Sequence, residues 1–459
     1  MRLILTFLLT CLGASVWAYD FAQPLKELPK TSHYSAMIYD VAKHQTVLSH
    51  QADVMMPPAS TSKLLTAIAA TLKLGSAFHY DTRLAITGTL KRHTLFGNVW
   101  LTFSGDPSLQ LDDLLRIFQS LRRHGIHRIQ GKVLLAGKPL AQQSYGPGWM
   151  WDELSACYAA PVSVFTVNEN CAQFQFKQRA KHQHRFHLLP KIPGGVQVVN
   201  QVKWRKQCQQ NSPVRLSYRG HDAYLWRGCS RQKKWHDSLA VRNTRRWSAA
   251  AVRLALKKSH ISVSKGVQVT HRTPKQLVWQ QSFASQPLSS LIRKVLKVSD
   301  NLYSSRIFLS LAGPIKLGGR WQQAAKALHQ IILDWSGESV MMVDGSGLSR
   351  LNQLSSQQLV NVLLKVYKTP KLFDVIAPAL AILGVDGTLK HRVVKMAKDV
   401  QIIGKTGGMT GVDSIAGYVI THKKVRYIYA LMMYGDAKNR GLRLKIRDNW
   451  LMHLADQSV

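Results

Sequence analysis

Three short motifs, separated by long stretches of chain, constrain this sequence more than any other feature. Ser60-Thr61-Ser62-Lys63 comes first, Ser299-Asp300-Asn301 follows with its serine 239 residues after Ser60, and Lys405-Thr406-Gly407 stands near the C-terminal end. A Ser-x-x-Lys, a Ser-x-Asn and a Lys-Thr-Gly in this order are typical of one serine site assembled from distant parts of a chain. The two ends are therefore expected to fold together, with the residues between the first two motifs inserted.

Patterns at both ends of the chain predict an α/β domain. Residues 64–72 form an apolar run typical of a buried helix, directly after the break at Pro57-Pro58, and a last helix is expected from about Arg440. Strand patterns lie at residues 35–41, 45–49, 401–404, 414–420 and 425–433. The roughly 200 intervening residues show short alternating strands with scattered glycine and proline, which predicts a mostly β insertion.

The N-terminal residues 1–18 have the composition of a secretory signal peptide. Arg2 precedes the apolar run 3–9, and small or apolar residues lead to Ala18, the expected cleavage site. The run is shorter than the roughly 20 apolar residues that cross a bilayer. Thr10 before Cys11 is a poor context for lipidation. We therefore expect a mature protein in the periplasm, soluble or peripherally associated with the membrane.

The cysteine content agrees with an oxidising compartment. Cys157, Cys171, Cys208 and Cys229 remain after the expected signal peptide, and four cysteines allow three disulfide pairings. Local loop closure favours Cys157–Cys171 and Cys208–Cys229. No Cys-x-x-Cys spacing is present, so a metal site is not expected.

The chain is strongly basic, with 62 Lys+Arg against 24 Asp+Glu and a formal net charge of +38. Residues 84–283 contain 31 basic and 8 acidic side chains. Nucleic-acid binding is the usual interpretation of such an excess, but secretion and the lack of a nucleic-acid-binding motif argue against it. A solvated basic surface and attraction to an anionic cell wall or lipid headgroup surface are the two remaining interpretations.

Ser60 and Lys63 combine a nucleophile with a base. A serine hydroxyl is a poor nucleophile until a base takes its proton, and residues three apart share a helix face, so Lys63 can reach Ser60. Lys63 has to be neutral for this role, and burial together with Lys405 as a second cation would lower its pKa. Two further Ser-x-x-Lys matches, at Ser230 and Ser262, do not begin an apolar helix.

The second motif suits proton delivery and substrate alignment. Ser299 is expected to pass a proton between Lys63 and the leaving amine, and the Asn301 amide to hold a backbone group of the substrate. Asp300, between them, is expected to face inward as a structural residue.

The third motif suits a terminal carboxylate and an oxyanion. Lys405 and Thr406 are candidate carboxylate ligands, and Gly407 allows a substrate to lie close to the strand. The backbone N–H groups of Ser60 and Gly408 are expected to form the oxyanion hole.

These motifs, together with Asp344-Gly-Ser-Gly-Leu-Ser-Arg350, make the chain similar to the low-molecular-mass class C penicillin-binding proteins, which are D-alanyl-D-alanine carboxypeptidases/endopeptidases. The resemblance covers nearly the whole mature chain. It implies a β-lactamase/transpeptidase-like catalytic domain, an antiparallel sheet flanked by helices with a helical subdomain, and a two-domain insertion. It also implies a Ser60 acyl-enzyme that acts on peptidoglycan stem peptides and cross-links, covalent inhibition by β-lactam antibiotics, and no metal or organic cofactor.

The resemblance also suggests domain boundaries. The catalytic domain is expected at 19–83 and 283–459, the inserted β-rich domain at 84–103 and 185–282, and a second nested domain at 104–184.

Two positions depart from the pattern of the family. Gly408 stands where a serine or threonine is usual, so a hydroxyl near the substrate carboxylate is lost. Glu153 stands where aspartate is common; by resemblance, this acid and Arg350 bind the zwitterionic end of a diaminopimelate side chain. Tyr158 is expected to pack on the same side chain.

Two other functions share some of these features. A β-lactamase has the same three motifs, but the Glu-containing deacylation motif of class A is missing and the insertion is too large for that compact fold. A penicillin-acylated sensor or inactive cell-wall-binding protein would not need the complete motifs. The oligomeric state, including a homodimer, stays open.

Overall fold

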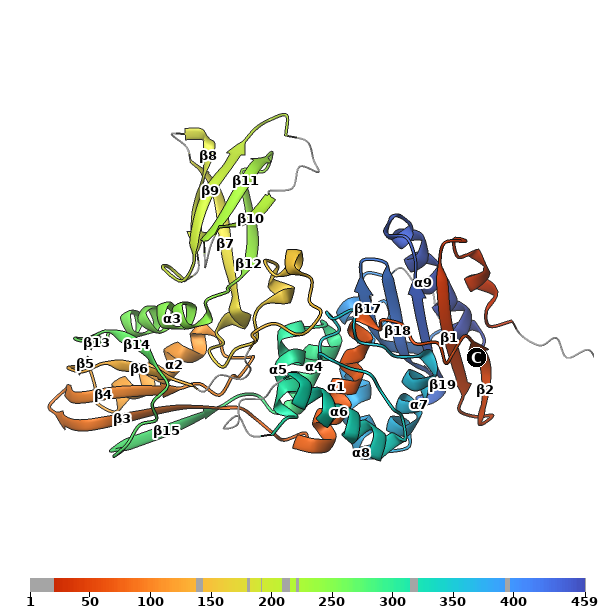
Figure 1. Ribbon diagram of the computed structural model, residues 1–459, viewed down its shortest axis with the longest axis horizontal. Helices are drawn as coiled ribbons and strands as arrows, with labels where there is room; N and C mark the ends of the chain where they lie inside the picture. Colours follow the sequence, from red (N-terminus) through yellow and green to blue (C-terminus); the bar gives the residue numbers. More distant parts are fainter. Residues whose placement is uncertain are drawn as a thin grey trace, which may run out of the picture.

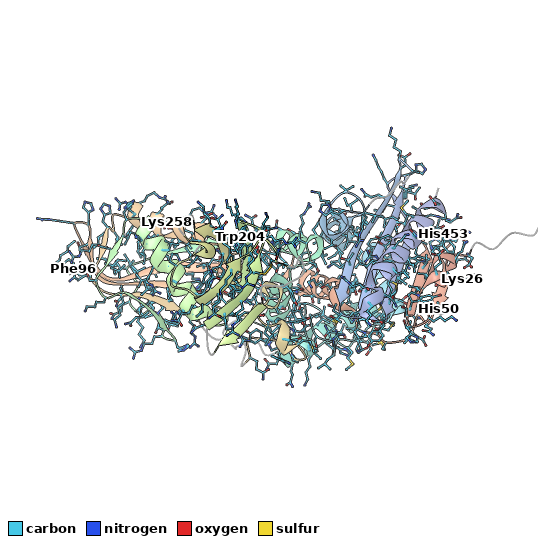
Figure 2. All side chains as sticks on the ribbon, turned by 90° about the horizontal axis from the view of Figure 1, so that it is seen from above. Lys26, His50, Phe96, Trp204, Lys258 and His453 are labelled. Atoms are coloured by element: carbon cyan, nitrogen blue, oxygen red, sulfur yellow. A yellow bond between two sulfur atoms is a disulfide. The ribbon has the colours of Figure 1, made fainter. Side chains whose placement is uncertain are left out.

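The computed structural model of the protein describes residues 20–137, 143–179, 182–190, 192–208, 215–219, 223–313, 321–392 and 397–458. The expected signal peptide, residues 1–18, lies outside the described residues. Figure 1 shows an elongated molecule in which the two chain ends form one α/β unit and the middle of the chain forms two further bodies beside it. Figure 2 shows the same elongation, with Phe96 and Lys258 at one end and Lys26 and His453 at the other.

The α/β unit is built on a six-stranded sheet that contains both ends of the chain. Its order is β16-β17-β18-β19-β1-β2, and every neighbouring pair is antiparallel. The strands are β1 (His33–Asp40), β2 (Gln45–His50), β16 (Ala381–Ile382), β17 (Val400–Met409), β18 (Val412–Thr421) and β19 (Lys424–Tyr434). The predicted hairpin and the three predicted C-terminal strands are confirmed.

Alternating side chains of this sheet pack against helices on both faces. Ile415 and Tyr429 belong to a core with Trp450 of α9, whereas Ala416 and Ala430 belong to the core of the helical subdomain. Successive residues of a strand point to opposite faces, so each strand supplies both cores. The helices are α1 (Lys63–Leu74), α4 (Leu288–Lys297), α5 (Asn301–Ser310), α6 (Trp321–Ser336), α7 (Ser356–Tyr367), α8 (Pro370–Ile376) and α9 (Arg440–Asp456). The predicted helices at 64–72 and from Arg440 are confirmed.

The insertion contains two sheets. The strands of the first are β3 (Asp81–Lys91), β4 (Thr94–Thr102), β5 (Arg128–Ile129), β6 (Val133–Ala136), β13 (Ser262–Val263), β14 (Val267–Thr270) and β15 (Trp279–Ala284). The strands of the second are β7 (Cys171–Arg179), β8 (His182–Pro190), β9 (Gln197–Trp204), β10 (Arg215–Arg219), β11 (Ala223–Ser230) and β12 (Lys234–Ala240).

This strand pairing divides the insertion differently from the expected boundaries. Residues 104–136 lie within the expected nested domain 104–184 but contribute β5 and β6 to the first sheet, where β6 pairs with β4 and β14. Strands β8 to β12, which lie in the segment 185–282 or begin just before it, belong to one sheet with β7, in the order β10-β11-β9-β8-β7-β12. The nested body therefore centres on residues 171–240, because strands must pair with neighbours that satisfy their backbone hydrogen bonds.

Two long helices accompany the strands of the insertion, α2 (Leu111–Arg123) and α3 (Thr244–Lys258). Each buries an apolar stripe, which includes Leu114, Phe118 and Leu121 in α2 and Val252 in α3, and the two helices contact each other. Among the described residues, every helix is too short or too polar to span a bilayer.

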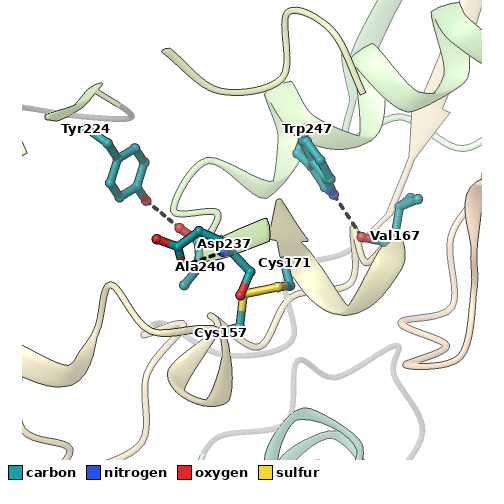
Figure 3. The surroundings of a disulfide bond; sticks show 8 residues. Cys157, Val167, Cys171, Tyr224, Asp237, Ala240 and Trp247 are labelled. Atoms are coloured by element: carbon teal, nitrogen blue, oxygen red, sulfur yellow. Dashed lines mark hydrogen bonds between the residues drawn. A yellow bond between two sulfur atoms is a disulfide. The ribbon is translucent and has the colours of Figure 1, made fainter. Parts of the chain in front are cut away.

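Both disulfides favoured by local closure are present, Cys157–Cys171 and Cys208–Cys229. Cys157–Cys171 lies where the nested body joins the rest of the insertion (Figure 3). Beside it, Trp247 of α3 donates its indole N–H to the carbonyl oxygen of Val167 at 2.8 Å, and the Tyr224 hydroxyl donates to the Ala240 carbonyl. The disulfide thereby ties the base of the nested body to the preceding segment, while the Trp247 bond stabilises the structure outside the nested body and the Tyr224 bond stabilises the body itself.

Candidate active site

The nucleophile motif lies at the start of the central helix. Ser60 belongs to a short 3-10 turn, η2 (Ala59–Ser62), that leads directly into α1. Ala59, just before Ser60, has a φ of 47°, a left-handed conformation that costs free energy for any residue other than glycine. Such strain is common at functional sites, where the surrounding fold maintains it.

Lys63 is completely buried and has three acceptors. Its Nζ donates to Ser60 Oγ at 2.8 Å and to Asn301 Oδ1 at 2.6 Å, and also to the backbone carbonyl of Ser346. The predicted contact between Lys63 and Ser60 is therefore present. Ser60 Oγ itself lies 3.4 Å from the Ser346 carbonyl, so its hydroxyl proton has an acceptor in the resting state.

Burial lowers the pKa of Lys63 to about 7, against the opposing attraction of the Asp344 and Asp300 carboxylates. A substantial neutral fraction is therefore available near neutral pH, as a general base needs. The pKa of Lys405 is also lowered well below its usual value, by its own burial and by repulsion from Lys63. The two lysines are thus close enough to interact, and burial is the main cause of both shifts.

The second motif joins two helices by a strained turn. Ser299 lies between α4 and α5 with a φ of 64°, and its Oγ accepts a hydrogen bond from Lys405 Nζ at 2.9 Å. Asp300 is the N-cap of α5 and accepts from the Tyr303 backbone N–H at 3.0 Å. Its place as a helix cap agrees with the structural role expected for it.

Asn301 is bonded on both sides of its amide. Oδ1 accepts from Lys63, and Nδ2 donates at 2.9 Å to the backbone carbonyl of Tyr158, which belongs to η4 (Cys157–Ala159) in the insertion. The insertion thus contacts the Ser-x-Asn motif directly.

Strand β17 carries the third motif past the nucleophile. A Cβ atom at Gly407 would lie 2.8 Å from the backbone nitrogen of Ser60, so only glycine allows this close approach. Gly408 is exposed to the cavity beside it. Thr406 Oγ1 donates to Thr388 Oγ1 at 2.7 Å, and Thr406 does not line the cavity.

The segment 344–350 supports this arrangement, and its contacts with Lys63 were not predicted from the sequence. Asp344 is completely buried and accepts hydrogen bonds from Ser346 Oγ at 2.6 Å, the Gly347 N–H at 3.0 Å and the indole N–H of Trp149 at 2.7 Å. These bonds hold the Ser346 carbonyl against Lys63. Because every residue has a backbone carbonyl, the amino-acid sequence does not indicate which one accepts this hydrogen bond.

A cavity of about 460 Å³ opens above Ser60. It brings together most of the residues predicted for the site, while Lys63 and Lys405 lie buried beneath it. Arg350 also lines it and donates through Nη2 to the Thr410 carbonyl at 2.8 Å. The predicted residues that line it are Ser60, Glu153, Tyr158, Ser299, Asn301, Arg350 and Gly408. Within the described residues, no group of three or more His, Cys, Asp or Glu side chains is arranged to hold a metal ion.

This fold and this site define a serine peptidase of the penicillin-interacting class, with a Ser–Lys pair, a Ser-x-Asn turn and a Lys-Thr-Gly strand around one cavity. The chain belongs to the D-Ala-D-Ala carboxypeptidase 3 (S13) family, whose model matches residues 19–453.

Individual relatives agree with this assignment. The chain is 27% identical to a D-alanyl-D-alanine carboxypeptidase DacB of Haemophilus influenzae over 95% of both sequences. It is 23% identical to a D-alanyl-D-alanine carboxypeptidase of Actinomadura sp., over 83% of this chain and 74% of that one. The crystal structure of penicillin binding protein 4 from Haemophilus influenzae superposes with a TM-score of 0.81 and 26% identity, over 96% of this chain and 99% of that one.

Proposed function

We propose that this protein is a periplasmic D-Ala-D-Ala carboxypeptidase and DD-endopeptidase that processes peptidoglycan stem peptides and cross-links through an acyl-enzyme on Ser60. The observation that carries the proposal is the hydrogen bond from completely buried Lys63 to Ser60 at the floor of an open cavity. A lysine with a pKa of about 7 can take the serine proton at neutral pH.

The reaction has two steps. Neutral Lys63 takes the proton of Ser60 as Oγ attacks the carbonyl carbon between two D-Ala residues, and the backbone N–H groups of Ser60 and Gly408 stabilise the oxyanion. The carbon–nitrogen bond then breaks, and the departing amine receives the proton through Ser299, which Lys405 holds in place. Water attacks the resulting ester, releases the shortened peptide and restores Ser60.

The same cavity accommodates two kinds of bond. A free C-terminal D-Ala leads to carboxypeptidase activity, and a cross-link with a D-centre at the same position leads to endopeptidase activity. Glu153, Tyr158 and Arg350 all line the cavity, and we assign to them the binding of the side chain of the third stem residue. Opposite charges on Glu153 and Arg350 suit a zwitterionic side-chain end such as that of diaminopimelate.

The basic surface suits the anionic cell envelope. The insertion carries most of the excess of Lys and Arg in a chain of formal net charge +38, and long-range attraction increases the local concentration of an oppositely charged polymer. We expect co-sedimentation with peptidoglycan that weakens as salt is raised.

Release of D-Ala from a synthetic pentapeptide, measured beside hydrolysis of benzylpenicillin, tests the proposal. We expect D-Ala release with slow penicillin turnover and digestion of cross-linked peptidoglycan. Rapid penicillin turnover without D-Ala release would identify a β-lactamase, and stable acylation without either activity would identify a sensor.

A further inference from the structure

Gly408 removes the hydroxyl that usually follows Lys-Thr-Gly in related sequences, and the structure places a guanidinium group in the same region. A Cβ atom at Gly408 would lie 2.9 Å from Nη2 of Arg440, at the start of α9. Both residues line the cavity above Ser60. The absence of a side chain at 408 is therefore what leaves room for the arginine.

Arg440 is held in this position by a buried carboxylate. Its Nε donates to Asp413 Oδ1 at 3.1 Å, and Asp413, which lies directly opposite Gly408 in the β17–β18 register, is completely buried. Such an anchor limits the rotamers of Arg440 and aims its terminal nitrogen atoms at the cavity.

The charge of Arg440 is not neutralised by this contact. Arg443, also completely buried, donates to Asp413 Oδ2 through Nη2 at 3.0 Å and through Nε at 3.2 Å. Two guanidinium groups thus share one carboxylate, which leaves a net positive charge at the cavity wall. The Arg440 side chain is 51% exposed, and its Nη groups make no hydrogen bond within the described part of the chain.

Two other cations at the site are Arg350 and Lys405, and Arg350 is already assigned to the side chain of the third stem residue in the proposed function. Lys405 is less suited than Arg440 to binding an anion. Lys405 is buried, and its Nζ already donates to Ser299 Oγ and to the Thr406 carbonyl. Its pKa is well below the usual value, whereas a guanidinium stays protonated at every physiological pH and binds a carboxylate through two parallel hydrogen bonds.

We propose that Arg440 is a specificity-determining residue that binds the C-terminal carboxylate of the substrate, in place of the hydroxyl that Gly408 lacks. The inference rests on the proposed function, because it assigns the group that recognises the terminal D-Ala carboxylate or the carboxylate of a β-lactam. If Arg440 has this role, the preference for ligands with a free carboxylate depends on Arg440. The intrinsic reactivity of Ser60 does not.

Benzylpenicillin and its methyl ester separate these two properties, because they share the reactive ring and differ only in the carboxylate. In Arg440→Ala, we expect the second-order acylation rate with benzylpenicillin to fall about 10- to 100-fold, the usual effect of losing a charged hydrogen bond. The rate with the ester should stay near the wild-type value. Lys438→Ala, which removes another exposed positive charge two residues away and outside the cavity, should leave both rates unchanged.

A second substitution tests the exchange of hydroxyl for guanidinium. Arg440→Ala vacates the space next to position 408, so Gly408→Ser in that background should recover part of the benzylpenicillin rate. With Arg440 present, the same serine would displace the guanidinium and should not raise the rate.

Equal losses for the acid and the ester in Arg440→Ala would overturn the proposal, since they would indicate that Arg440 only supports the fold through Asp413. An unchanged rate with benzylpenicillin would overturn it as well. A wild-type chain that neither compound acylates would contradict the proposed function itself, and this inference with it.

Discussion

At the scale of single residues, a substitution at Ser299 distinguishes two effects: the free-energy cost of its strained backbone and the contribution of its hydroxyl group to acylation. Its φ of 64° costs a non-glycine residue about 1 kcal/mol, and glycine costs a similar amount through the entropy of the unfolded chain. Ser299→Gly should therefore change the melting temperature little. Because Lys405 loses its hydroxyl acceptor, acylation by penicillin should fall at least about 100-fold, as for the loss of a proton-transfer group. Wild-type acylation in the folded variant would exclude Ser299 from proton transfer.

We expect one residue, Lys63, to set the pH dependence of acylation as well. Because the pKa of Lys63 in the folded protein is about 7, the neutral base increases tenfold per pH unit below that value and levels off above it. We expect the second-order rate of penicillin acylation to follow this curve, and Lys63→Arg, which stays protonated, to be inactive throughout. A rate of acylation that stays constant from about pH 5 to about pH 8, a range that includes this pKa, would contradict the assignment of Lys63 as the base.

The same pKa shift affects stability, with a definite sign. The folded pKa lies below the unfolded value of about 10.4, so the unfolded state binds more protons between the two. Burial of Lys63 therefore lowers the free energy of unfolding by its full amount below pH 7, and this loss of stability becomes smaller as the pH rises toward the pKa of the unfolded state.

At the scale of elements, the two disulfides form a matched pair with different expected effects on activity. They close loops of similar length, with sequence separations of 14 and 21, so loss of either should cost about 3 kcal/mol of stability. Cys157→Ser/Cys171→Ser also frees the turn whose Tyr158 carbonyl binds Asn301, and should slow penicillin acylation. Cys208→Ser/Cys229→Ser should not. Acylation rates are measured at a temperature at which both double variants are folded. Equal rates in the two variants would contradict a role of the Tyr158 turn in supporting Asn301.

Local patterns predicted the elements of the α/β unit, because a hairpin, an apolar helix and alternating strands are read over a few residues. The hydrogen-bond acceptors of Lys63 differ in the same way, according to their distance along the sequence. Ser60 is three residues away and could be predicted, whereas the Ser346 carbonyl comes from a segment whose position depends on buried Asp344. The register of the insertion could not be predicted either, since each residue of β6 pairs with a residue of β14 that lies 134 positions later in the chain.

At the scale of the whole molecule, the described residues of the nested body, β7 to β12, do not line the cavity above Ser60. Its first and last strand residues, Cys171 and Ala240, are neighbours in the β7–β12 pairing, so residues 172–239 can be replaced by a short Gly/Ser turn that keeps Cys157–Cys171. We expect the shortened chain to be acylated by penicillin within about threefold of the intact rate, since nothing that lines the cavity is removed. It should bind peptidoglycan less tightly, because many basic residues are lost. A folded but unreactive shortened chain would contradict this division.

The central claim is that Ser60, activated by Lys63, forms the covalent intermediate. The most direct test is incubation with benzylpenicillin followed by peptide mapping in the mass spectrometer. We predict a single adduct on the peptide that contains Ser60, and no adduct in Ser60→Ala. An adduct that persists in Ser60→Ala, or maps to another residue, would contradict the account.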